Sequence, residues 1–197
     1  MADEQQRQTL LQGARRWNAW RRQHSQTPID LRKADLTRAG LKRAYLAGAD
    51  LRKADLRWAS LKRADLTGAD LRKAELMLAD LTDAKLGGAD LRGAGPVFAN
   101  LDGADMRMAK LSKASFIDAD LHNARLGGAD LRGASLYLAD LTGTDFEGAN
   151  LTGADLTAAK FGGDDYKMDP FRVYSLVGSS LRSINFNGKT DIEQPLT

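Results

Sequence analysis

The chain has 197 residues, enough for one domain or for one repeat array with flanking segments. It contains no cysteine, which excludes a disulfide framework and a thiolate metal site, and its two histidines, His24 and His122, argue against a histidine metal cluster. The net charge of +3 is too small to indicate nucleic-acid binding, although residues 1–76 carry +8 and residues 77–197 carry −5. No run of about 18 apolar residues predicts a membrane span, and no apolar signal core is evident, so we expect a cytoplasmic protein.

Residues 3–23 have the pattern of an amphipathic helix. Its apolar face is made of Leu10, Leu11, Ala14, Trp17 and Trp20. Its polar face carries Arg15, Arg16, Arg21 and Arg22. Thr27-Pro28 is expected to stop the helix, so residues 1–28 are predicted to form a helical cap on the elements that follow. The arginines leave a helix on a membrane surface as the alternative.

A five-residue period dominates the next part of the chain. Every fifth position from Leu31 to residue 161 gives 27 positions, of which 22 are Leu. The exceptions are Pro96, Met106, Phe116, Phe146 and Phe161. The residue two places earlier is Ala at 25 of 26 positions, and the exception is Thr144. Because Pro96 lacks a backbone N–H, we expect a local bend or bulge there.

A period of five fits neither regular helix nor regular strand. Successive Leu residues would spiral around an α-helix and would alternate between the two faces of a strand. The chain must therefore turn once per pentad, which keeps Leu and Ala inside and leaves the three other residues outside. Gly is common two places after Leu, as at Gly48 and Gly68, where a turn needs a positive φ.

Tandem A-(D/N)-L-x-x units, as in residues 49–53 and 149–153, resemble the pentapeptide-repeat family over residues 29–163. The resemblance implies an all-β solenoid: a right-handed quadrilateral parallel β-helix with four pentads per coil and about 7–8 coils. Four pentads per coil predict a 20-residue superperiod. The sequence shows one, because Leu-Arg-Lys-Ala begins at Leu31, Leu51 and Leu71.

The repeat weakens towards the C-terminus. The five-residue phase continues through Tyr166, Phe171, Leu176, Leu181 and Phe186, but the Ala partners are lost. We expect a degenerate coil or cap over residues 164–190 and a flexible tail over residues 191–197. In some members of the family this end forms a dimer contact, so the resemblance leaves a dimer through this end open.

One side of the predicted rod is apolar on the outside. The two residues that follow its central position give eight apolar side chains, here called the apolar strip: Trp58, Met77, Leu78, Val97, Phe98, Ile117, Tyr137 and Leu138. Stacked at the spacing of the coils, they predict a surface for a protein partner or for self-association. Two alternatives are coverage by the protein's own terminal segment and high β propensity without a partner.

Another side carries charges in matched rows. Aspartates precede and arginines follow the central Leu: Asp30, Asp50, Asp70, Asp90 and Asp130, with Arg32, Arg52, Arg72, Arg92 and Arg132. We interpret these rows as a solvated ladder of salt bridges, each worth at most about 1 kcal/mol. The alternative is a binding surface for an anionic polymer, and the negative charge of the aspartates argues against it.

The sequence predicts a protein that is not an enzyme and needs no cofactor or metal. A filled Leu/Ala interior leaves no pocket, and no pairing of nucleophile and base stands out. We predict a scaffold that binds proteins through the apolar strip. The alternative comes from the resemblance, because some family members mimic DNA, bind DNA gyrase or topoisomerase and protect it from quinolones or toxins. Mimicry needs an acidic rod, whereas residues 31–161 hold 20 Lys/Arg and 18 Asp/Glu.

Overall fold

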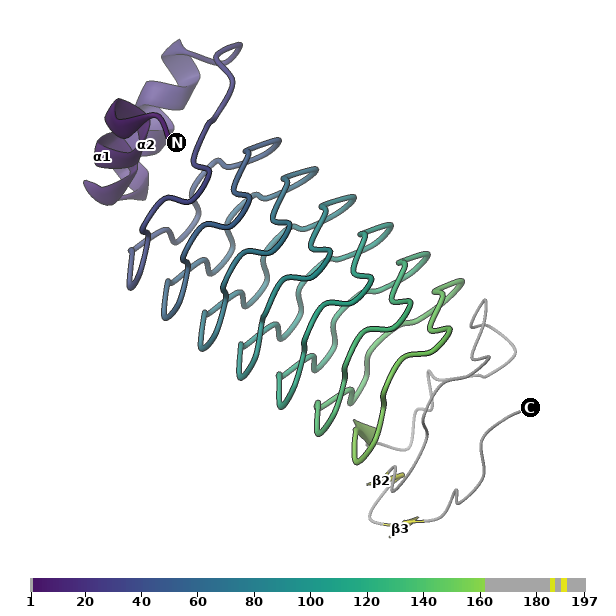
Figure 1. The fold of residues 1–197 in the computed structure, drawn as a ribbon. Helices are drawn as coiled ribbons and strands as arrows, with labels where there is room; N and C mark the ends of the chain where they lie inside the picture. The colour runs from purple at the N-terminus through teal and green to yellow at the C-terminus, as the bar shows by residue number, and fades with distance from the viewer. Residues whose placement is uncertain (1, 162–184, 187–188, 191–197) are drawn as a thin grey trace.

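The structure, a computed structural model, describes residues 2–161 together with the backbone of residues 185–186 and 189–190. Two helices, α1 (Glu4–Leu11) and α2 (Ala14–Gln23), precede a long rod of stacked coils (Figure 1). Three short strands follow: β1 (Lys160–Phe161), β2 (Asn185–Phe186) and β3 (Lys189–Thr190). Between α2 and β1 the chain consists of tight turns and single parallel bridges, so each side of the rod is held by one bridged residue per coil.

The coils repeat every 20 residues. Asp30 is bridged to Asp50, and Asp50 in turn to Asp70. At each bridge two hydrogen bonds join neighbouring coils: the Leu31 N–H donates to the Asp50 carbonyl at 2.8 Å, and the Asp50 N–H donates to the Ile29 carbonyl at 2.9 Å. Four bridges per coil give the rod four sides, which confirms the predicted superperiod. The 27 pentads up to residue 161 make just under seven turns, so a further coil depends on residues outside the described range.

A tight turn ends each pentad. In the first, the Ala34 N–H donates to the Leu31 carbonyl at 3.1 Å, and Lys33 between them has φ of 58°. A positive φ at the third position of such a turn is the requirement of a type II turn. Gly48 and Gly68 occupy this position with φ of 66° and 64°, which confirms the reason predicted for glycine there.

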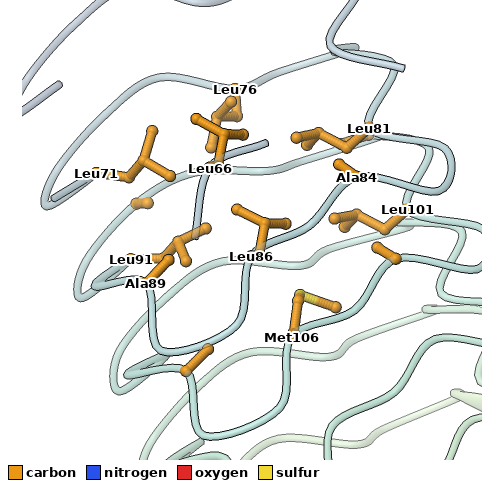
Figure 2. Packing of buried hydrophobic residues seen from close by; sticks show 14 of the residues in the cluster. Leu66, Leu71, Leu76, Leu81, Ala84, Leu86, Ala89, Leu91, Leu101 and Met106 are labelled. Atoms are coloured by element: carbon orange, nitrogen blue, oxygen red, sulfur yellow. The ribbon is translucent and has the colours of Figure 1, made fainter. Parts of the chain in front are cut away.

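The interior of the rod is filled by two kinds of side chain. The central Leu residues and the Ala residues two places earlier are buried. Figure 2 shows the columns that result, with Leu66, Leu86 and Met106 following one another along one side. Thr144, which replaces Ala, is also buried, and its hydroxyl donates to the Leu121 carbonyl at 2.7 Å. A polar atom is therefore accommodated there because it has a partner.

Pro96 removes one bridge without disturbing the phase. Gly95 is bridged to Glu75 in the coil before it, but the bridge to Ser115 that the pattern requires is missing from the rod. The Leu76 N–H reaches the Gly95 carbonyl at 3.2 Å, whereas the equivalent bonds in other coils measure 2.6 to 2.8 Å. The five-residue phase continues unchanged on both sides. The expected bulge is therefore absent, because neighbouring bridges hold the coil in place.

The N-terminal segment forms two helices, so the prediction of a single helix over residues 3–23 was wrong. The break lies at Gly13, whose positive φ of 103° is far from helical values and is readily accessible only to glycine. Asp3 caps α1, because its carboxylate accepts from the Gln6 N–H at 3.0 Å. The change of direction lets Leu10 and Trp17 both become fully buried.

Groups of the N-terminal segment, mostly side chains of the two helices, bond to backbone groups of the first coil that have no preceding coil to pair with. The Gln6 side chain accepts from the Asp30 N–H at 2.9 Å, and the Asp3 N–H donates to the Asp30 carbonyl at 2.8 Å. On another side, Asn18 accepts from the Tyr45 N–H, and the Trp17 indole N–H donates to the Tyr45 carbonyl, both at 2.8 Å. At each of these two residues, the N–H and the carbonyl thus have the same two hydrogen bonds that join neighbouring coils at a bridge.

The last coil pairs with the strands that follow it. β1 is parallel to β2, with Lys160 opposite Asn185, and β2 is antiparallel to β3. Four pentads per coil would place residue 180 opposite Lys160, whereas the observed partner, Asn185, lies 25 residues further along the chain. The rest of the predicted coil or cap over residues 164–190 and the predicted tail over 191–197 lie outside the described residues.

Candidate interaction surface

The structure places the eight residues of the apolar strip at the turns along one corner of the rod. Hydrogen bonds stack these turns directly: the N–H of Trp58 donates to Met77, that of Leu78 to Val97 and that of Phe98 to Ile117, each at 3.0 Å. Two rows result. The outer row contains Trp58, Leu78, Phe98, Asp118 and Leu138, and the inner row contains Met77, Val97, Ile117 and Tyr137. The predicted strip is thus spatially continuous, with one charged residue in its outer row.

Five of these side chains are largely open to solvent. Trp58, Leu78, Phe98, Tyr137 and Leu138 are between 40% and 50% exposed. Met77, Val97 and Ile117 are half-buried between them. Large apolar side chains that remain this exposed in four of five consecutive coils form a patch of the kind that marks interaction sites.

The backbone conformation of the outer row is unusual for bulky residues. Trp58 and Phe98 have φ of 58° and 56°. An L-residue in this left-handed region costs roughly 1 kcal/mol, and a bulky residue there is rare. At other corners of the same rod Gly68, Gly88 and polar residues such as Lys33 fill the equivalent position with the same sign of φ, so the turn itself does not require an apolar side chain. The strip is therefore not explained by the needs of the fold.

Arginine side chains lie over one end of the strip. The guanidinium groups of Arg38 and Arg57 lie 5.4 Å and 5.7 Å from the centre of the Trp58 ring, a cation–π geometry. Arg57 also bonds to Asp55 and approaches Glu75 at 3.3 Å. Sequence reasoning missed this contact. The signal was available, because Arg38 occupies the turn position of Trp58 one coil earlier.

The aspartate and arginine rows form the ladder that the sequence predicts. Arg52 makes a two-pronged contact with Asp50, at 2.8 Å and 2.6 Å, and approaches Asp70 of the next coil at 3.5 Å. The pattern repeats at Arg32 and Arg72. Since these arginines already have carboxylate partners, the ladder is a weak candidate for binding an anionic polymer.

The ladder predicts loss of stability in acid. The hydrogen bond from Arg32 lowers the pKa of Asp30 to about 2, and the bond from Arg72 lowers the pKa of Asp70. In the unfolded chain an aspartate has a pKa of about 3.9, so the contribution of these pairs is complete above that pH. We expect the urea midpoint of unfolding to be constant from about pH 7 to 5 and to fall between about pH 4 and 2.

The Asp70→Asn variant provides the control for this pH dependence. It should be less stable than the parent at neutral pH and should lose less stability on acidification, because one of the titrating carboxylates is gone. A urea midpoint that stays constant down to pH 2 in the parent chain would contradict the role given to the ladder.

Other exposed apolar side chains stand alone. Met108 is 69% exposed, with φ of 58°, at a corner where the turns are otherwise rich in glycine. Gly87 and Gly127 leave the surface hollowed on either side of Arg107 and Met108. The side chain of Met108 lies over Gly128. It has no apolar neighbour of its own row, so it offers a matched comparison for the strip.

Comparison with known proteins fits this architecture. A family model described as pentapeptide repeats matches in eight copies, over residues 29–68, 59–94, 99–136 and 134–163. The chain belongs to the pentapeptide repeat family. Solved pentapeptide repeat proteins form right-handed quadrilateral β-helices, and members of the family are in general structural repeat proteins without enzymatic activity. No curated protein sequence matches the chain closely enough to count as a relative.

Three solved structures illustrate the range of the pentapeptide repeat proteins it resembles. A trypsin-treated form of QnrB1, a plasmid-mediated fluoroquinolone resistance protein, is 27% identical over 76% of each chain, with a TM-score of 0.58. HetL of Nostoc sp. strain PCC 7120, involved in regulating heterocyst differentiation, is 29% identical over 81% of this chain and 78% of its own, with a TM-score of 0.39. A thylakoid-lumen protein of Arabidopsis thaliana is 34% identical over 66% and 75%, with a TM-score of 0.28.

The part of the chain that the structure describes contains no helix long and apolar enough to cross a membrane. Within those residues no group of three or more His, Cys, Asp or Glu side chains is arranged to hold a metal ion.

Proposed function

We propose that this pentapeptide repeat protein is a non-catalytic scaffold that binds another protein chain through the apolar strip. One observation carries the proposal: exposed apolar side chains occupy the left-handed turn position in four of five successive coils at this corner, interrupted at Asp118, whereas glycine or a polar residue fills most of the equivalent positions elsewhere in the rod. Such side chains become favourable once a partner removes them from water. The filled Leu/Ala interior supports a role in binding rather than catalysis.

The N-terminal segment is a poor candidate to cover the strip. Its contacts run to the end of the rod, through Gln6 to Asp30 and through Trp17 to Tyr45, and Figure 1 places both helices beyond the first coil. We infer that α1 and α2 cap the open end, as residues 1–28 were predicted to do, and that residues 29–163 form the repeat domain. A cytoplasmic location stays a prediction.

The proposal predicts a loss of partner capture when the strip is made polar. The Trp58→Asn/Phe98→Asn double variant keeps the turns, because asparagine tolerates a positive φ. Affinity capture from the native host, quantified by mass spectrometry, should lose its specific partners by about tenfold or more, since each buried aromatic anchor is worth 2 kcal/mol or more.

The matched control is Met108→Asn, which changes an exposed apolar residue at the same turn position on another corner. It should capture the same partners as the parent chain. If the double variant also captures them undiminished, the strip is not the binding surface.

A second candidate function is protection of a topoisomerase from quinolones. The similarity to QnrB1, at 27% identity and a TM-score of 0.58, favours it. The charge distribution opposes it, because the arginines of the ladder are paired with aspartates and the rod lacks the strong negative charge of duplex DNA. A gyrase supercoiling assay with a fluoroquinolone tests this candidate function. Protection of the enzyme at stoichiometric amounts of the chain supports it, and a lack of protection rules it out.

A further inference from the structure

The apolar strip is nearly symmetric about its midpoint. Phe98 lies in the middle of the outer row, with Trp58 two coils before it and Leu138 two coils after it. In the inner row, Val97 has Met77 and Ile117 one coil away on either side, and the last member, Tyr137, is mirrored by Arg57. A surface of this kind is self-complementary when a second copy is turned end for end, which is the requirement for a two-fold interface.

We propose that the occupant of the strip is a second copy of this chain, packed antiparallel about a two-fold axis at Phe98. The inference rests on the proposed function of the strip as a protein-binding surface and names its partner. In this arrangement Phe98 meets Phe98, Trp58 meets Leu138, and Met77 meets Ile117. Two strip residues face a charged side chain instead of an apolar one, because Leu78 faces Asp118 and Tyr137 faces Arg57.

The spacing of the coils favours a second rod as the occupant. Neighbouring coils lie about 4.8 Å apart, so Trp58 and Leu138 are separated by roughly 19 Å along the corner. A second copy presents its side chains at the same interval. Contacts made at Phe98 therefore stay in register to both ends of the strip.

The distribution of charge selects the antiparallel direction. Residues 1–76 carry a net charge of +8, and residues 77–197 a net charge of −5. Antiparallel packing places the basic half of one rod beside the acidic half of the other, whereas parallel packing places like charges side by side. At one end of the strip it brings Arg57 opposite Tyr137, a cation–π partner.

The size of the strip predicts a weak dimer. The five largely exposed side chains present on the order of 100 Å² each, so two copies would bury roughly 1,000 Å². This is about the smallest area of a specific protein interface, which corresponds to dissociation in the micromolar range.

The first experiment asks whether the strip associates with itself. Sedimentation velocity of the full chain across the micromolar range should show a monomer–dimer equilibrium. Phe98→Asp and Phe98→Lys place like charges face to face on the axis, and each alone should weaken the dimer by about tenfold or more. An equal mixture of the two variants should restore it. Lysine occurs at the equivalent turn positions Lys33 and Lys53, and aspartate at Asp83 and Asp118, so both variants keep the fold.

The matched controls are Met108→Asp and Met108→Lys, which should dimerise like the parent chain. If the parent chain stays monomeric across the micromolar range, the inference is overturned. The proposed function is then still tested separately, by the capture experiment with Trp58→Asn/Phe98→Asn. Dimers that persist in both Phe98 variants also overturn it.

The second experiment tests the direction of packing. The chain has no cysteine, so single cysteines introduce the only thiols. A short bis-maleimide should join Trp58→Cys chains to Leu138→Cys chains in a mixture, and should join neither variant efficiently to itself. Cross-links of each variant only to itself would show a parallel arrangement and would overturn the inference.

Discussion

Replacing Trp17 with alanine is expected to lower the free energy of unfolding by about 3–5 kcal/mol. The side chain is fully buried at the end of the rod, and its ring stacks on Trp20 at 5.1 Å. Its indole N–H also occupies the Tyr45 carbonyl, which has no earlier coil to pair with. The substitution removes apolar burial and one edge hydrogen bond together. Urea unfolding followed by circular dichroism measures the loss.

Two variants separate the contributions of Trp17. Trp17→Phe keeps an aromatic ring at this position and removes the indole N–H donor, so it should cost about 1–2 kcal/mol. Leu11→Ala changes a helix residue that is 40% exposed and should cost about 0.5 kcal/mol or less. Amide exchange at Leu31 and Leu41 should accelerate in Trp17→Ala, because an uncapped end of a repeat array opens first. If Trp17→Ala and Leu11→Ala are equally stable, the helices do not cap the rod.

The repeat itself was predictable because one physical requirement recurs without interruption. Leu and Ala at fixed positions from Leu31 onward specify which side chains are inside, and the 20-residue superperiod specifies which coils are neighbours. The members of the apolar strip follow from these two facts. The left-handed backbone of these residues does not follow from the sequence, because glycine is the usual sequence signal for a positive φ and neither Trp58 nor Phe98 is glycine.

The ends of the rod were less predictable for different reasons. An isolated glycine within a helical pattern is usually tolerated, so Gly13 gave little warning that it separates α1 from α2. The bonds of Gln6 and Asn18 replace a missing coil, and their partners are defined only once the first coil is in place. After residue 161 the Ala partners are lost, so the phase no longer determines that β2 pairs with β1 at a separation of 25 residues.

Phe116 and Phe98 provide the sharpest contrast between a residue that holds the fold and one that is available to a partner. They lie one coil apart on the same side of the rod, yet Phe116 is fully buried and Phe98 is 50% exposed. Phe116→Ala should lower the free energy of unfolding by about 3–5 kcal/mol. The cavity cannot close, because hydrogen bonds such as that from the Phe116 N–H to the Ser135 carbonyl, at 2.7 Å, hold the coils at a fixed spacing.

Phe116→Leu restores the residue found at most central positions and should cost less than about 1.5 kcal/mol. Phe98→Ala, measured at a concentration where the chain is monomeric, should change stability by about 0.5 kcal/mol or less. Urea unfolding of the three variants beside the parent makes the comparison. If Phe98→Ala is as destabilising as Phe116→Ala, the exposed ring supports the rod itself, and the apolar strip loses its main argument as a binding surface. If only Phe116→Ala is destabilising, the strained turn at Phe98 is retained for an interaction outside the monomer.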